Sequence, residues 1–235
     1  MIEIKNVTKK YGDKIAIKNI SFDIKDGEIF GFIGHNGAGK TTMIKSLIGI
    51  LNFDDGDILI NNKSIKEDPI SCKLEMAYVP DNPDLYENMT AIDFINFVCD
   101  MYETPVNVRK ENIEKYSKMF EMENKLNDDI SSFSHGMKQK VSLIAALSHN
   151  PQILIMDEPF VGLDPKAVFD IKNVMKQMTK EGKIIFFSTH ILDVAEKLCD
   201  RVAIIKNGDI IKIGKMKDIK GDSSLEEVFL ELEEK

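Results

Sequence analysis

The most informative segment of the chain reads Gly34-His35-Asn36-Gly37-Ala38-Gly39-Lys40-Thr41-Thr42. It fits the pattern G-x-x-x-x-G-K-[ST], in which glycines let the backbone curl until successive N–H groups point at phosphate oxygens. The segment follows the apolar run 29–33 and opens a stretch with helical spacing, so the positive end of a helix adds to the same site. A chance glycine-rich turn is the alternative, but it does not account for a strand, a loop and a helix in this order. The segment therefore predicts a site for a nucleoside triphosphate.

The polar residues that close this loop have distinct predicted roles. Lys40 supplies an ammonium group for the β- and γ-phosphates, and the Thr41 hydroxyl is a candidate ligand for Mg²⁺. Thr42 is placed to hydrogen-bond the α-phosphate. The preceding residues, 34–39, are expected to surround the phosphates with their backbone. The predicted cofactors are accordingly a nucleotide and Mg²⁺.

A pair of acidic residues, Asp157 and Glu158, follows the apolar run 153–156. This position predicts the carboxyl edge of a buried strand, where open α/β sheets hold ligands. We expect Asp157 to hold Mg²⁺ through water and Glu158 to deprotonate the attacking water as general base. A solvated turn is the alternative for an isolated Asp-Glu pair. His190 follows another apolar run, 184–187; it is expected to reach the γ-phosphate, although a lone histidine after a strand is more often structural.

The apolar pattern along the rest of the chain predicts an α/β fold. Alternating residues over 2–24 predict antiparallel strands, and continuous apolar runs predict strands buried on both faces of a mainly parallel sheet. Helical spacing between these runs places helices on both faces of that sheet. The predicted strands lie at 29–33, 58–60, 153–156, 184–187 and 202–205, and the predicted helices at 42–51, 166–178 and 191–198.

The same pattern suggests how the chain is divided. Residues 90–149 are expected to form an inserted helical subdomain between two parts of a catalytic core, 1–89 and 150–220, the first of which carries an antiparallel β subdomain. Residues 221–235 are expected to form an amphipathic helix behind a capping box. Its stripe packs against its own domain or contacts a partner chain, and the sequence leaves both open. The capping box pairs Ser224 with Glu227, and the stripe consists of Leu225, Val228, Phe229 and Leu232.

Composition excludes several classes of protein. The chain has 235 residues, 43% hydrophobic and 30% charged, which is too apolar for a disordered protein. Its net charge of -8 argues against a duplex nucleic-acid binder, so no nucleic-acid partner is expected. The three cysteines are scattered, which argues against a zinc site and for free thiols in a reducing compartment. We see no signal peptide and no apolar stretch of about 20 residues that could span a bilayer.

A further segment, Ser132-Phe133-Ser134-His135-Gly136-Met137-Lys138-Gln139-Lys140, precedes the acidic pair. It resembles the signature of ABC ATPases, whose common form is Leu-Ser-Gly-Gly-Gln; Ser134 and Gly136 match it, whereas Phe133, His135 and Met137 depart. With the phosphate loop and the acidic pair, nearly the whole chain resembles the nucleotide-binding domain of ABC transporters. The resemblance implies a P-loop NTPase core of the ABC type. It also implies that Ser134 and Gly136 contact the γ-phosphate of ATP held by a second subunit.

Other positions take their expected roles from this resemblance. Tyr11 matches the aromatic residue that stacks on adenine, although an ordinary strand-end tyrosine is the alternative. His190 matches a switch histidine, and residues 161–164 resemble a loop that crosses the dimer. Asp81 stands where the family usually has a glutamine that touches the metal. It can still ligate Mg²⁺, but its charge beside Glu158 is expected to perturb both carboxylates.

The resemblance implies an ATP-hydrolysing subunit that drives export through a separate membrane permease by ATP-dependent dimerisation. Its partners would be that permease, docked near residues 81–105, and a second ATP-binding subunit, identical or homologous. It would be cytoplasmic, peripheral on the inner face of the cell membrane. An ABC ATPase without a transport function is one alternative. A P-loop kinase or GTPase is another, but no Asn-Lys-x-Asp base-reading motif is present.

Overall fold

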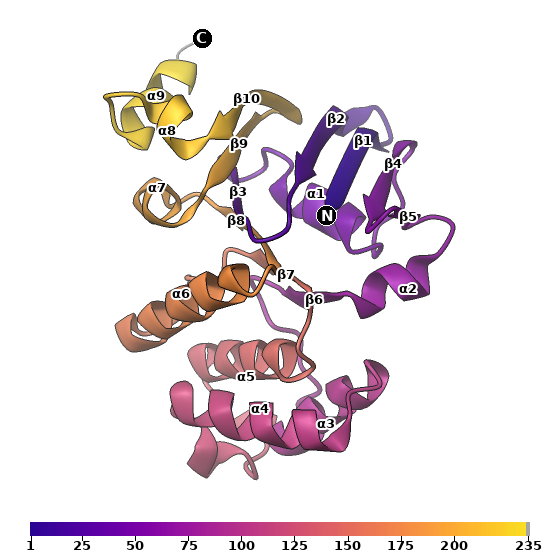
Figure 1. Cartoon of the computed structure of the whole chain (residues 1–235), viewed down its shortest axis with the longest axis vertical. Helices are drawn as coiled ribbons and strands as arrows, with labels where there is room; N and C mark the ends of the chain where they lie inside the picture. Colours follow the sequence, from indigo (N-terminus) through magenta and orange to yellow (C-terminus); the bar gives the residue numbers. More distant parts are fainter. Residues whose placement is uncertain (234–235) are drawn as a thin grey trace.

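The computed structural model describes residues 1–233, which form two β-sheets and the helices that cover them (Figure 1). The first sheet is antiparallel and has the order β2-β1-β4-β5. Residues that alternate in the sequence alternate between the core and solvent here, as the pattern over 2–24 predicts. The antiparallel N-terminal sheet is thus confirmed. Its strands are β1 (Ile2–Tyr11), β2 (Lys14–Ile24), β4 (Asp55–Ile60) and β5 (Lys63–Ser64).

The second sheet has the order β10-β9-β3-β8-β7-β6, and all of its neighbours are parallel except the β9–β10 pair. This confirms the predicted mainly parallel sheet. Every residue of its central strand β3 is buried, because the sheet is covered on both faces. Its strands are β3 (Ile29–Ile33), β6 (Met76–Val79), β7 (Ile153–Asp157), β8 (Ile184–Thr189), β9 (Arg201–Lys206) and β10 (Asp209–Lys215).

Two groups of helices lie at opposite ends of the molecule, and α1, α2, α6 and α7 lie between them (Figure 1). Figure 1 shows α3, α4 and α5 together at one end and α8 and α9 at the other. Residues 90–149 carry α3, α4, α5 and two short 3₁₀ helices, which agrees with their helical pattern; their separation as a subdomain stays a prediction. The helices are α1 (Lys40–Leu47), α2 (Pro69–Leu74), α3 (Ala91–Met101), α4 (Val106–Met119), α5 (His135–Ser148), α6 (Pro165–Lys180), α7 (Leu192–Leu198), α8 (Met216–Lys220) and α9 (Leu225–Glu233), and the 3₁₀ helices are Glu123–Lys125 and Ile130–Ser132.

Two predicted features need correction. The helix expected at 42–51 begins at Lys40 and ends at Leu47, because Gly49 adopts a left-handed φ of 64° that stops helical propagation. The two edge strands of the second sheet, β6 and β10, are absent from the predicted elements. The Ser224–Glu227 capping box is confirmed. The Ser224 backbone N–H donates to the Glu227 carboxylate, and the Glu227 backbone N–H donates to the Ser224 hydroxyl.

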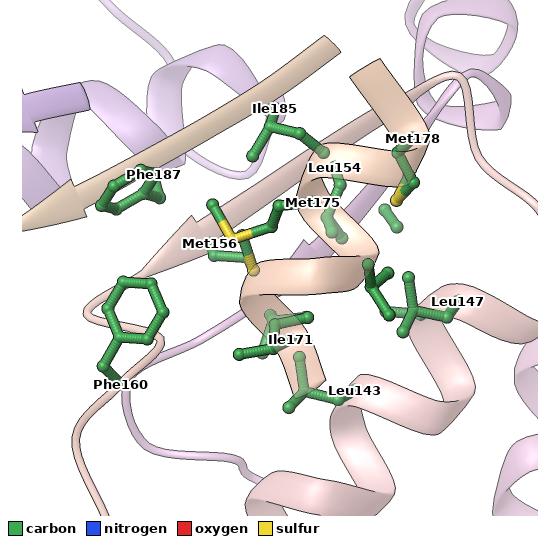
Figure 2. Packing of buried hydrophobic residues seen from close by; sticks show 14 of the residues in the cluster. Leu143, Leu147, Leu154, Met156, Phe160, Ile171, Met175, Met178, Ile185 and Phe187 are labelled. Carbon is green, nitrogen blue, oxygen red and sulfur yellow. The ribbon is translucent and has the colours of Figure 1, made fainter. Parts of the chain in front are cut away.

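The core consists of two hydrophobic clusters. One lies between the parallel sheet and the helices α5 and α6, where Leu143 lies beside Ile171 (Figure 2), and it extends to α3, α4, α7, α8 and α9. The other joins the two sheets. In it Phe22 of β2 stacks on Phe30 of β3, with ring centroids 5.0 Å apart and nearly parallel planes. The two sheets and α1 therefore share one hydrophobic cluster, in which stacked rings join β2 to β3.

Candidate nucleotide-binding site

The carboxyl ends of the parallel strands meet at one edge of the sheet and define the candidate site. Strand β3 leads into the loop 34–39, β7 ends at Asp157, β8 leads to His190, and β6 leads to Asp81. A cavity of about 440 Å³ opens beside this edge. The cavity is lined by Tyr11, Lys14, Ile15, Ala16, Asn36, Gly37, Gly39, Lys40, Thr41, Thr42, Asp81, Asp157, Glu158 and Asn207.

The phosphate loop closes onto the first turn of α1. Gly39 is the N-cap of that helix at a φ of 113°, a conformation that side chains with a Cβ rarely adopt. A Cβ there would also lie 2.6 Å from the carbonyl oxygen of Ala16. Glycine is therefore required at this position. Gly34, His35 and Ala38, which the sequence also assigns to the nucleotide, are not among the residues that line the cavity in the described part of the chain.

The Lys40 ammonium is nearly buried, with 6% of the side chain exposed. It donates to the carbonyl oxygens of Gly34 at 2.7 Å and His35 at 3.3 Å. It also lies 3.3 Å from Glu158 Oε1. A buried cation needs partners of this kind, and phosphate oxygens would compete with Glu158 for it.

The metal candidates Thr41 and Asp157 are in direct contact. The Thr41 hydroxyl donates to Asp157 Oδ2 at 2.8 Å, and the Ser188 hydroxyl donates to Asp157 Oδ1. Ser188 is fully buried and fixes the orientation of the carboxylate, a role that the sequence did not suggest. The signal is the register of the parallel pair, which sets Asp157 opposite Ser188.

Glu158 and His190 also meet. The His190 Nδ1 atom lies 3.0 Å from Glu158 Oε1, and the His190 backbone N–H donates to Oε2 at 3.3 Å. Within residues 1–233 the contacts at Oε1 are not aligned as hydrogen bonds. Burial raises the pKa of Glu158, but the contacts with His190 and Lys40 outweigh burial and hold its pKa below the ordinary value. Glu158 itself adopts a left-handed φ of 47°.

Asp81 lines the same cavity. Partial burial raises its pKa most, and the negative charges of Asp157 and Glu158 raise it further, while His135 and His190 act in the opposite direction. The expected perturbation is thus seen at Asp81. At Glu158 the net shift has the opposite sign, because the contacts with His190 and Lys40 prevail there.

The oxygen donors at the cavity suit Mg²⁺. Thr41, Asp81 and Asp157 line it together, and hydroxyl and carboxylate oxygens are the ligands that this hard cation prefers. Residues 1–233 contain no cluster of three or more His, Cys, Asp or Glu side chains that could cage a metal alone. This donor set fits an ion that completes its coordination with phosphate oxygens and water.

The cavity is also lined by Tyr11, Lys14 and Asn207. Tyr11 is 51% exposed, so its ring has an accessible face, and the Lys9 ammonium lies 5.5 Å from the ring centroid. Lys14 and Asn207 were not predicted. The dipeptide Asn207-Gly208 lies between two apolar runs and is a strong hairpin signal. This signal could have identified Asn207.

The predicted signature residues lie elsewhere on the surface. Ser134 is exposed and caps α5 by accepting from the Met137 backbone N–H at 3.3 Å. A Cβ on Gly136 would lie 2.7 Å from the carbonyl oxygen of Gly162, so the signature and the loop 161–164 approach closely. In residues 1–233 neither Ser134 nor Gly136 lines the cavity.

A family model described as ABC transporter matches residues 17–161. The chain belongs to this family. The ABC-type transporter ATP-binding protein EcsA of Bacillus subtilis (strain 168) is 34% identical, over 99% of this chain and 96% of that protein. A solved ATP-binding subunit of an ABC transporter superposes with a TM-score of 0.96 at 33% identity, covering 99% of both chains. The dimeric ATP-binding cassette MJ0796, solved in a post-hydrolysis state with ADP and Pi, has a TM-score of 0.83 at 27% identity over 92% of this chain and 99% of its own.

The chain is therefore the ATP-binding subunit of an ABC transporter and an ATPase. The kinase and GTPase alternatives are excluded by this membership. Across residues 1–233, no helix combines the length and the apolar character needed to cross a bilayer.

Proposed function

We propose that two copies of this subunit, or one copy and a homologue, close around two Mg-ATP molecules and drive export through a separate permease. One observation carries the proposal: Ser134 and Gly136 are displayed away from the chain's own cavity, at the start of α5. The positive end of this helix suits an anion. A second chain that presents them to the γ-phosphate would complete each site.

In each site, residues of one chain would bind and activate the nucleotide. Lys40 would move from Glu158 to the β- and γ-phosphates, because a triphosphate carries more negative charge than one carboxylate. Loss of the Lys40 contact removes one of the interactions that lower the pKa of Glu158. The carboxylate then becomes a stronger base for the attacking water. His190 would hold Glu158 in place through the contacts at 3.0 and 3.3 Å.

The metal site proposed here consists of Thr41, Asp157 and Asp81. Bound Mg²⁺ would neutralise charge on the β- and γ-phosphates. Ser188 would keep Asp157 oriented toward it through their hydrogen bond. Tyr11, which lines the cavity, would stack on the adenine ring.

The permease is proposed to dock over residues 81–105 and to hold the subunit on the inner face of the cell membrane. Exposed apolar side chains support this location: Tyr86, Phe97 and Met101 are 59%, 39% and 64% exposed. The Tyr86 ring meets Phe97 edge-on at 5.7 Å. The segment begins at Asp81 in the cavity, so hydrolysis and docking would affect the same stretch of chain. Export is proposed from the resemblance of the Ser-x-Gly-Met-Lys-Gln signature to that of bacterial exporters.

Glu158→Gln tests the proposed dimer. The substitution removes the general base, so hydrolysis should slow by about 10²–10⁴-fold, while Mg-ATP binding persists. Light scattering on the size-separated variant should then show an ATP-dependent dimer. Glu67→Gln, at an exposed position, is the control and should behave as the wild type. A Glu158→Gln protein that stays monomeric with saturating Mg-ATP would contradict the proposal.

A further inference from the structure

The C-terminal helix α9 packs against the rest of the subunit through its apolar face. Leu225 is fully buried, and Val228 and Phe229 are 8% and 5% exposed. The Leu225 backbone N–H donates to Glu196 of α7 at 2.9 Å, and Glu196 pairs with Lys220 at 2.7 Å. The sequence left open whether this apolar stripe packs against its own domain or contacts a partner chain. Leu225, Val228 and Phe229 pack within the chain.

One side chain of this helix meets the phosphate loop directly. The Phe229 ring contacts the His35 ring edge-on, with centroids 4.8 Å apart and planes at 71°. This geometry is the favourable one for two aromatic rings. His35 is therefore directed at α9, which explains why it does not line the nucleotide cavity in the described residues.

The backbone of His35 holds the residue that binds phosphate. Its carbonyl oxygen accepts from Lys40 Nζ at 3.3 Å and from the Ala38 backbone N–H at 3.1 Å. A change in the position of His35 would thus change both the curl of the loop and the position of the Lys40 ammonium.

A second contact links α9 to the other end of the loop. Lys206 Nζ donates to the carbonyl oxygen of Leu232 at 3.1 Å, where the negative end of a helix favours a cation. Lys206 precedes the β9–β10 turn, whose Gly208 N–H donates to the Ala38 carbonyl oxygen at 2.9 Å. Asn207 of the same turn lines the nucleotide cavity.

We propose that α9 supports the phosphate loop from behind, and that Phe229 is a positioning residue for nucleotide binding. It acts through His35 and touches neither the nucleotide nor the reacting atoms. The loop then keeps its phosphate-binding shape only while the C-terminal helix is docked.

Variants of the full chain at Phe229 test this role. Phe229→Ala should raise the Kd for a fluorescent ATP analogue with Mg²⁺ by about two- to tenfold, the range that one aromatic edge contact contributes. Hydrogen exchange of the amides of residues 34–41 should become faster. Phe229→Tyr keeps the ring edge and should bind as the wild type does.

Val228→Ala is the matched control. It truncates a comparably buried side chain one residue earlier, which is turned by about 100° around the helix axis, so it should lower the melting temperature without changing the Kd. Equal losses of affinity in Val228→Ala and Phe229→Ala, or an unchanged Kd in Phe229→Ala, would overturn the proposal.

Two further variants keep the test decisive. If Phe229→Ala does not fold, Phe229→Leu replaces it, and a Leu variant that binds as tightly as Phe229→Tyr rejects the role. The double variant His35→Ala/Phe229→Ala should bind the ATP analogue no more weakly than the weaker-binding single variant. Each single substitution already removes the same contact between the two rings. Additive losses would contradict a shared contact.

Discussion

At the scale of single residues, the carboxylates of the site differ in what surrounds them. Asp157 accepts hydrogen bonds from Thr41 and Ser188, whereas Glu158 lies beside a lysine and a histidine. Asp81 has acidic neighbours, and its pKa is raised by partial burial and by their charge. The cavity thus holds an aspartate whose pKa is raised and a glutamate whose pKa is lowered.

Asp81→Gln should leave the Kd for Mg-ATP nearly unchanged but alter turnover, because it removes a negative charge beside Asp157 and Glu158. The raised pKa means that Asp81 takes up a proton at a higher pH than an ordinary aspartate as the pH falls. The acid limb of the kcat–pH profile should therefore change shape in the variant. Steady-state hydrolysis between pH 5 and about pH 9 measures both effects. Asp84→Asn, an exposed acid in the same loop, is the control; identical profiles for Asp81→Gln and the wild type would remove Asp81 from catalysis.

The single residues that could be predicted are those whose chemistry follows from local spacing. Lys40 and Thr41 fall in a short pattern, and Asp157 and Glu158 follow an apolar run. Ser188 and Lys14 could not be identified in this way, because their place in the site depends on strand register and on the approach of the two sheets. The left-handed φ of Glu158 also has no local signal, since side chains other than glycine and asparagine rarely adopt it.

At the scale of elements, helix starts were the most predictable features. Asp164 caps α6 by accepting from the Ala167 backbone N–H at 2.8 Å, and Pro165 follows in the first turn. Asp164 also pairs with Lys140 at 2.7 Å. The contact with Lys140 and the hydrogen bond from Ala167 lower the pKa of Asp164. An aspartate followed by proline is the local pattern of a helix start, whereas the ion pair with Lys140 has no local signal.

Asp164→Ala should destabilise the subunit by about 1 kcal/mol, because the first turn of α6 loses its cap. Asp164→Asn keeps a capping oxygen and should cost less. Because the folded-state pKa is lowered, the charge-dependent stabilisation is present above the ordinary value of 3.8 and is lost as the pH falls from there toward the lowered pKa. Urea unfolding at neutral pH and below pH 3.8 measures the loss of stability and its dependence on pH. An Ala variant as stable as the wild type at neutral pH would refute the capping role.

The β9–β10 hairpin was predictable in principle. Asn207 and Gly208 have φ values of 50° and 84°, as a two-residue turn of this kind requires. The predicted strands nevertheless end at 202–205, so the predictions do not include the turn that reaches the nucleotide cavity. The contact between Phe229 and His35 has no comparable signal, because it joins residues far apart in the chain.

At the scale of the whole molecule, the proposed site is shared between chains, and mixing variants tests this. A Glu158→Gln chain lacks the base, and a Ser134→Arg chain presents a bulky residue to its partner's nucleotide. In a mixed dimer one site combines the intact base with an intact Ser134. The mixture should therefore hydrolyse ATP faster than the sum of the two variants measured separately. A rate equal to that sum would show that each chain works alone.

The close approach of Gly39 to Ala16 has one more consequence. Tyr11 ends a strand of the antiparallel sheet, Lys40 follows a strand of the parallel sheet, and the two sheets meet beside the cavity at this glycine. We expect this contact to fix the distance between Tyr11 and Lys40 during folding, before any nucleotide arrives. The protein would then lose little conformational entropy when the nucleotide binds.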